Sequence, residues 1–233
     1  MRQAIFVKSF RFLPWFGGAI FLAMVVSAEP SPPMDSRAEC LEEKWIEGPS
    51  MNGGIFRGTL EIRCRITGAA QSTVAGLRAS IENRIRRTKK VADEAKEIGE
   101  AGLPTGTFDA TTVLNEGEGS SEVAIRDRIR VGSNERDHLL YRTDSLDIRA
   151  KGMGSHLKEV SFFSELRADP SGSGSFFLVM RNVTAIERPW YAAPVFFTPI
   201  AKRVTLDKFR RAREVLLSLI LTRLSGREPP ADG

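Results

Sequence analysis

The segment IFRGTLEIRCRI, residues 55–66, alternates between apolar and polar side chains over most of its length. A period of two residues is typical of a β-strand that buries one face and leaves the other in water. The buried face is predicted to hold Phe56, Leu60, Ile62, Cys64 and Ile66, and the other face Arg57, Glu61, Arg63 and Arg65. This strand is the clearest element of the chain.

A helical region is predicted next, over about residues 72–98. Val74, Leu77, Ile81 and Ile85 recur at steps of three and four residues, which is the spacing of an apolar helical stripe. A basic run follows within it, and acidic residues after it offset much of its charge. A solvated helix face is favoured over a phosphate-binding patch for this run, which comprises Arg84, Arg86, Arg87, Lys89 and Lys90.

An antiparallel meander and a long helix are predicted for the remainder. Turns rich in Gly and Ser separate five candidate strands, and short turns imply antiparallel neighbours. Residues 189–199 hold three prolines and are expected to be an irregular connection before a helix over about Leu206–Leu224. Thr205 is the expected N-cap. The strands are expected at 106–115, 121–131, 138–149, 156–168 and 175–188.

The first 28 residues have the pattern of a cleavable secretory signal. They begin with Arg2, Lys8 and Arg11, continue with a short apolar stretch and end in Val26-Ser27-Ala28, although an uncleaved membrane anchor is the alternative. Cleavage would lower the formal net charge from +5 to +2, because the leader carries three basic residues and no acidic one. A nearly balanced chain offers no electrostatic case for nucleic acid. We expect a periplasmic or secreted protein.

Four segments follow from these patterns: the signal 1–28, a leader 29–49, a domain 50–225 and a tail 226–233. Cys40 and Cys64 are the cysteines of the chain. In an oxidising compartment such a pair is most simply a disulfide, with metal ligation and a nucleophilic thiol as the alternatives. The bridge would staple the leader to the strand at 55–66.

The order of elements resembles the START-like superfamily, also called helix-grip or Bet v 1-like proteins and including polyketide cyclases. Val160–Arg167, a Gly/Ser turn and Phe176–Glu187 resemble the family's final hairpin, and Pro194–Pro199 resembles the entry to its last helix. The resemblance implies an α+β fold, in which a curved antiparallel sheet wraps around the long carboxy-terminal helix and a helical pair follows the first strand. Six strands are predicted, whereas the minimal fold has seven.

The sequence contains no recognisable catalytic or metal-binding motif, so neither a cofactor nor a metal is predicted. His138 and His156 each begin a strand after a turn, where exposed histidines are ordinary. Asn182-Val183-Thr184 fits a glycosylation sequon but falls in the middle of a predicted strand.

Asp127 is the one acid that interrupts an apolar face, that of the strand at 121–131. A buried acid is costly unless it is paired. If Val131 faces His138 across the hairpin, Asp127 faces Arg142, which predicts an ion pair on the inner face. The pair is either structural or a polar anchor in an apolar cavity. The expected cavity residues are Asp127, Arg142, Ile129, Leu140, Phe162, Leu216 and Ile220.

The resemblance implies a non-enzymatic binder of a lipid or other hydrophobic molecule, and the signal pattern adds that this binder is exported. One alternative is a cyclase- or hydrolase-type enzyme on the same fold, with Asp127 as acid or base. Another is a cell-envelope interaction protein without a small ligand. Any contact with a membrane is expected to be transient.

Overall fold

The computed structural model describes residues 37–67, 74–99, 102–115, 122–134, 137–150, 156–171 and 174–224. The expected signal at 1–28 and the expected tail at 226–233 lie outside the described residues. The strand at 55–66 and the five strands of the meander are all present, with bounds that differ from the predicted ones by at most two residues.

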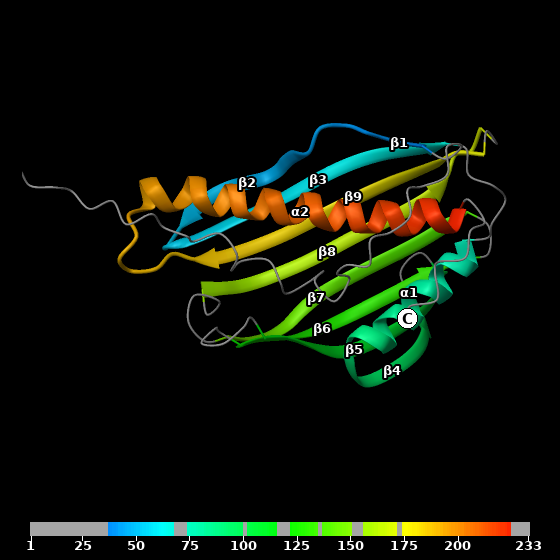
Figure 1. Cartoon of the computed structure of the whole chain (residues 1–233), viewed down its shortest axis with the longest axis horizontal. Helices are drawn as coiled ribbons and strands as arrows, with labels where there is room; N and C mark the ends of the chain where they lie inside the picture. The colour runs from blue at the N-terminus through cyan, green and yellow to red at the C-terminus, as the bar shows by residue number, and fades with distance from the viewer. Residues whose placement is uncertain are drawn as a thin grey trace, which may run out of the picture.

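Within the described ranges, nine strands form one antiparallel sheet, and two helices accompany it (Figure 1). The helices are α1 (Val74–Thr88) and α2 (Pro194–Leu224). The strands are β1 (Arg37–Cys40), β2 (Lys44–Asn52), β3 (Ile55–Thr67), β4 (Lys90–Ile98), β5 (Pro104–Asn115), β6 (Glu122–Ser133), β7 (His138–Ala150), β8 (Leu157–Ala168) and β9 (Phe176–Glu187).

The sheet has the order β1-β3-β9-β8-β7-β6-β5-β4, and β2 also pairs with β3. β1 and β2 lie on successive halves of the same edge of β3, because Cys40 pairs with Cys64 whereas Asn52 pairs with Ile55. A disulfide joins Cys40 to Cys64, as the sequence predicted. Residues 37–40 and 44–52 are therefore strands of the same sheet, whereas residues 29–36 of the expected leader lie outside the described residues.

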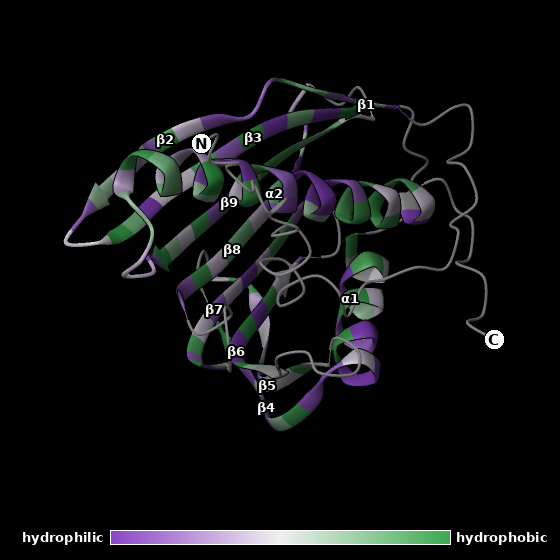
Figure 2. Cartoon of the chain, turned by 60° about the vertical axis from the view of Figure 1, so that its left-hand side comes forward, coloured by the Kyte–Doolittle hydropathy of each residue, from purple (hydrophilic) through white to green (hydrophobic). Residues whose placement is uncertain are grey.

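Both helices lie on one face of the curved sheet, which we call the inner face (Figure 1). α2 packs chiefly on β3 and β9, and α1 packs on β4, β6 and β7. β3 and the strands β5 to β9 direct their apolar sides to this face, so hydrophobic and hydrophilic residues alternate along them (Figure 2). A long carboxy-terminal helix against a curved antiparallel sheet is the arrangement that the helix-grip resemblance implied.

The predicted helical pair is wrong, because its second half is the strand β4. Residues of β4 such as Ala92, Glu94 and Ala95 favour helices, and its position at the edge of the sheet leaves most of its side chains exposed. No apolar alternation therefore marks it in the sequence. Pairing with β5 decides its conformation, and β3 to β9 together supply the seven strands of the minimal helix-grip fold.

The predicted irregular connection is also partly wrong, since α2 begins at Pro194 instead of Leu206. Proline suits the first position of a helix, where its missing N–H would have no intrahelical partner. The hydroxyl of Thr198 donates to the carbonyl of Pro194 at 2.9 Å and supports this first turn. Pro199 lies within the helix and removes one further hydrogen bond.

Candidate functional site

A small group of polar side chains lies on the inner face, among the apolar residues of β5, β6 and β7. Thr112, Asp127 and Thr143 are buried there, each on a different strand. Lys89 joins them from the single-residue link between α1 and β4, and only 6% of its side chain is exposed. We call Lys89, Thr112, Asp127, Tyr141 and Thr143 the inner polar cluster.

Lys89 makes the central contacts of this cluster. Its Nζ lies 2.9 Å from Oδ2 of Asp127 and donates at 2.7 Å to Oγ1 of Thr112. Its backbone N–H donates to the carbonyl of Ile85, so the residue continues the last turn of α1 before β4 begins. The position of Lys89 therefore depends on how α1 is held against the sheet.

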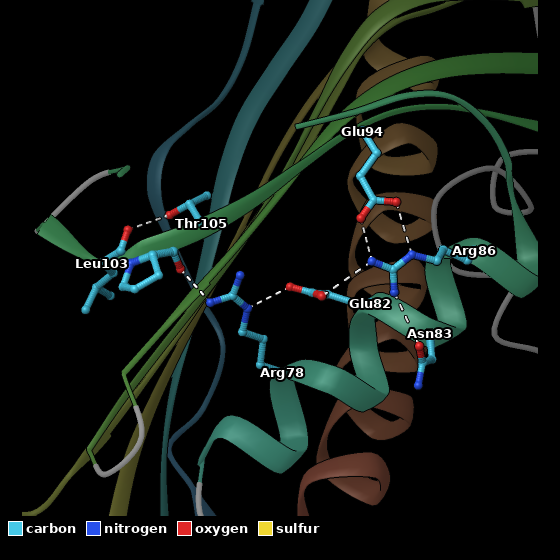
Figure 3. A network of polar contacts seen from close by, with 8 residues as sticks. Arg78, Glu82, Asn83, Arg86, Glu94, Leu103 and Thr105 are labelled. Carbon is cyan, nitrogen blue, oxygen red and sulfur yellow. Dashed lines mark hydrogen bonds and ion pairs between the residues drawn. The ribbon is translucent and has the colours of Figure 1, made fainter. Parts of the chain in front are cut away.

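Ion pairs hold α1 in place (Figure 3). Arg78 contacts Glu82 at 2.6 Å and also donates to the carbonyl of Pro104 at the start of β5. Arg86 pairs with Glu94 of β4 at 2.5 Å, and Glu82 lies 3.6 Å from the same guanidinium. Because these contacts connect α1 to both β4 and β5, they fix the link that carries Lys89.

The environment changes the acidity of two members of the cluster. Burial raises the pKa of Asp127, and the neighbouring Lys89 only partly opposes this shift. Burial also raises the pKa of Tyr141 to about 12; a hydrogen bond with Thr143 opposes this shift, and the charge of Asp127 adds a smaller increase. An acid with a raised pKa beside an ammonium group is a feature found at ligand sites as well as in structural ion pairs.

One buried oxygen of the cluster, Oδ1 of Asp127, has no hydrogen-bond partner among the described residues, and Asp127 is completely buried. The hydroxyl of Thr143 is also buried and lies against the hydroxyl of Tyr141. A buried polar atom without a partner costs about 1–3 kcal/mol, so native proteins usually satisfy it with protein, water or ligand. Asp127 needs a donor at this atom, which a hydroxyl group would supply.

Apolar side chains surround the cluster. Phe108, Ile129 and Phe162 come from β5, β6 and β8, and Leu216 and Ile220 come from α2. All five are buried in the same core cluster as Tyr141. The inner face is therefore mainly hydrophobic, with its polar atoms concentrated around Asp127.

Five of the seven expected cavity residues lie on the inner face, and two do not. The structure places Asp127, Ile129, Phe162, Leu216 and Ile220 there, but Leu140 and Arg142 lie on the outer face. Whether the five line a cavity stays a prediction.

The predicted pairing of Asp127 with Arg142 is wrong. Val131 pairs with Tyr141 rather than His138, and the same register continues along the hairpin and sets Asp127 opposite Ser145. β6 continues to Ser133, which shortens the turn that the sequence suggested. Arg142 instead contacts Asp144 at 2.8 Å on the outer face.

Sequence reasoning missed four members of the cluster: Lys89, Thr112, Tyr141 and Thr143. Lys89 was assigned to a solvated helix face, because the strand after it was not recognised. Tyr141 and Thr143 do alternate with their neighbours in β7, so a correct register would have placed them beside Ile129 and Val131. Nothing local in the sequence marks Thr112.

A second candidate site is a hollow of about 350 Å³ on the outer face of β4, β5 and β6. Its charged side chains largely bind one another. Arg128 makes a bidentate contact with Asp109 at 2.8 and 3.0 Å, which holds the pKa of Asp109 below its usual range, and Arg130 contacts Asp144 at 3.0 Å. The hollow is lined by Asp93, Ala95, Glu97, Thr107, Asp109, Arg128 and Arg130. A surface whose charges pair with one another in this way supports a ligand site less strongly than the unpaired Oδ1 of Asp127 on the inner face.

Other site types find no support in the part of the chain that the structure describes. No three His, Cys, Asp or Glu side chains there are placed to share a metal ion. No helix among the same residues is long and apolar enough to cross a bilayer. His138 contacts Glu165 at 2.9 Å on the outer face, away from the cluster.

No protein-family model and no curated protein matches the chain. Among solved structures, the chain is similar to the di-domain ARO/CYC StfQ from the steffimycin biosynthetic pathway, with 16% identity over 73% of this chain and a TM-score of 0.34. It spans half of that protein's length. It is also similar to a START superfamily protein from Mycobacterium smegmatis, with 12% identity, 75% of this chain and 99% of that chain covered, and a TM-score of 0.32. Likenesses of this size assign no function.

Proposed function

We propose that this protein binds a hydrophobic small molecule or lipid against the inner face of its sheet. The apolar body of the ligand would lie among side chains such as Ile129, Phe162 and Ile220. A hydroxyl group on the ligand would donate to Oδ1 of Asp127, the buried atom without a partner. That atom is the observation that carries the proposal, because a hydroxyl on a bound ligand would supply the donor that it lacks.

Lys89 has a clear role in this proposal. Its ammonium group neutralises Asp127 without occupying both carboxylate oxygens, so one oxygen stays available to a ligand. Thr143 offers a hydroxyl that either donates or accepts. The anchor would therefore select a molecule with a polar end on an apolar body over a pure hydrocarbon.

The protein is proposed to work outside the cytoplasm. The Cys40–Cys64 disulfide is typical of oxidising compartments, and the sequence of the first 28 residues has the pattern of an export signal. The disulfide and the export pattern together suit a binding protein that works in the periplasm or is secreted.

Native mass spectrometry of gently purified protein tests the binding proposal. We expect a co-purified hydrophobic molecule on the wild type and its loss from Asp127→Asn, which keeps the size of the side chain. Asp109→Asn is the matched control, because Asp109 is an ion-paired acid on the outer face of the neighbouring strand. Retention of the molecule by Asp127→Asn would contradict the anchor. A wild type that carries nothing and binds no hydrophobic dye would contradict the binder.

An enzyme is the second candidate, favoured by the raised pKa of Asp127 beside Lys89. In that case Asp127 would act as an acid or base on a ligand held at the same place. The same variant distinguishes the two candidates. If folded Asp127→Asn still carries a molecule, and this molecule differs chemically from the one on the wild type, the result would favour an enzyme over simple binding.

A further inference from the structure

Large apolar side chains are exposed together at one end of the molecule. They are Trp190, Tyr191, Val195, Phe196 and Ile200, which we call the apolar tip, and they fall within eleven consecutive residues. Trp190 is 90% exposed and Phe196 is 72% exposed. An exposed apolar patch of this kind marks a site of interaction with a protein or a membrane.

The tip is held in a defined conformation. It comprises the connection after β9 and the first turns of α2, at the end of the sheet where β2 turns into β3 (Figure 1). The backbone N–H of Arg188 donates to the carbonyl of Gly54 at 2.7 Å, and its guanidinium donates to the carbonyl of Ala192. The rings of Trp190 and Tyr191 pack edge to face at 5.7 Å.

The start of α2 has two apolar sides. Phe197 and Ala201 point inward and pack with Phe56 and Ile186 of the sheet. Phe196 and Ile200, four residues apart, lie on the other side of the helix and remain exposed. Since the inward side alone suffices to dock α2 on the sheet, the exposed side needs another explanation.

The charge around the tip is positive on balance. Residues 188–203 contain Arg188, Lys202 and Arg203 and no acidic residue. The nearest acids in the sequence, Glu187 and Asp207, contact Lys158 at 2.8 Å and Arg203 at 3.9 Å. Lys202 and Arg203 follow Ile200 directly and are exposed. An apolar surface bordered by cations is complementary to the interface of a bilayer that contains anionic phospholipids.

We propose that the apolar tip docks on the surface of an anionic phospholipid bilayer. Trp190 and Tyr191 have the amphipathic rings that favour the headgroup level, while Val195, Phe196 and Ile200 would enter the acyl boundary. A second copy of the chain fits less well. A symmetric contact between two tips would set the same cations against each other. None of these residues belongs to the inner polar cluster, so docking does not depend on the ligand site.

Vesicle flotation tests this proposal on protein whose amino terminus has been defined by intact mass. We expect the protein to float with vesicles of phosphatidylcholine and about one third phosphatidylglycerol, and to float poorly with phosphatidylcholine alone. The double variant Trp190→Ser/Phe196→Ser should bind on the order of a hundredfold more weakly. Lys202→Glu/Arg203→Glu should lose on the order of tenfold or more on anionic vesicles. Ile98→Ser is the matched control, since Ile98 is 73% exposed on the edge strand β4 and should bind like the wild type.

Fluorescence identifies the part of the chain that enters the bilayer. Brominated phospholipid should quench the wild type and should not quench Trp190→Phe, although this variant should still float. Quenching that persists in Trp190→Phe would overturn the proposal, because another tryptophan would then be in the membrane. Equal flotation of the wild type and Trp190→Ser/Phe196→Ser would overturn it as well. So would a concentration-dependent dimer that the double variant loses, which would assign the tip to a second copy.

Discussion

Nζ of Lys89 lies 2.9 Å from Oδ2 of Asp127, although the two residues are 38 positions apart in the chain. The contact joins the end of α1 to the middle of the sheet, and both side chains are almost completely buried. An ion pair of this kind loses most of its hydration on folding. Its contribution to the free energy of unfolding therefore depends on both partners being present.

A double-mutant cycle should therefore show strong coupling between Lys89 and Asp127. We expect Lys89→Met and Asp127→Leu each to lower the free energy of unfolding by about 3–5 kcal/mol, because each leaves an uncompensated buried charge. The double variant should lose much less than the sum of the two, as measured by chemical denaturation. Arg142→Ala is the control and should cost no more than about 1 kcal/mol, because its pair with Asp144 remains partly exposed to solvent on the outer face. Additive effects at Lys89 and Asp127 would show that the pair is not buried.

A second expectation concerns export and the disulfide. Intact mass of exported protein should correspond to a chain that begins at Glu29 and lacks the two hydrogens of free thiols at Cys40 and Cys64. Cys40→Ala/Cys64→Ala should lower the stability by about 3 kcal/mol, since the bridge links residues 24 positions apart. A mass that retains Met1 would contradict processing, and free thiols would contradict the bridge.

The sequence predicted those elements of the fold whose side chains alternate or repeat clearly. β3 and the strands β5 to β9 bury one face each, so the period of two residues is visible in their composition. β4 buries almost nothing, and its pairing with β5 is a tertiary effect that local propensity does not report. The sequence did not predict the start of α2 at Pro194, because the three prolines within residues 189–199 favoured an irregular connection.

The candidate site was predictable only in part. Asp127 was found because an acid on an apolar strand face is unusual, but its partner depends on the cross-strand register and on a chain segment outside the hairpin. The register of the hairpin pairs Val131 with Tyr141 instead of His138, and this three-residue difference, which the sequence does not show, sets Ser145 rather than Arg142 opposite Asp127. Lys89 comes from a link whose position follows from α1 and β4 together.

Asp169 should contribute to stability in a way that acid removes. Hydrogen bonds from the backbone and hydroxyl of Ser171 and the hydroxyl of Ser175, with the charge of Arg65, lower its pKa from 3.8 to about 2. The folded-state pKa is thus below the usual value, so the stabilisation is present above about pH 4 and is lost as the pH falls toward 2. Asp169→Asn should flatten the pH dependence of stability in this window, measured by denaturation at several pH values. An unchanged slope would mean that the carboxylate is not held in the folded state.

The last expectation separates the two sides of α2. Leu216 and Ile220 face the sheet and are buried, so Leu216→Arg or Ile220→Arg would place a charge in the apolar core. Either change should lower the melting temperature strongly and abolish binding of a hydrophobic dye. Ile200→Arg introduces the same group on the exposed side of the same helix and should leave the melting temperature nearly unchanged.

The same three variants distinguish packing from membrane docking. Because Ile200 belongs to the apolar tip, Ile200→Arg should alter flotation with anionic vesicles without altering dye binding. If Leu216→Arg and Ile220→Arg were as stable as the wild type, α2 would not be packed on the sheet through these residues. The proposed ligand site would then lack the apolar side chains of α2. The membrane-docking proposal would be unaffected, because the start of α2 is attached to the sheet through Phe197 and Ala201.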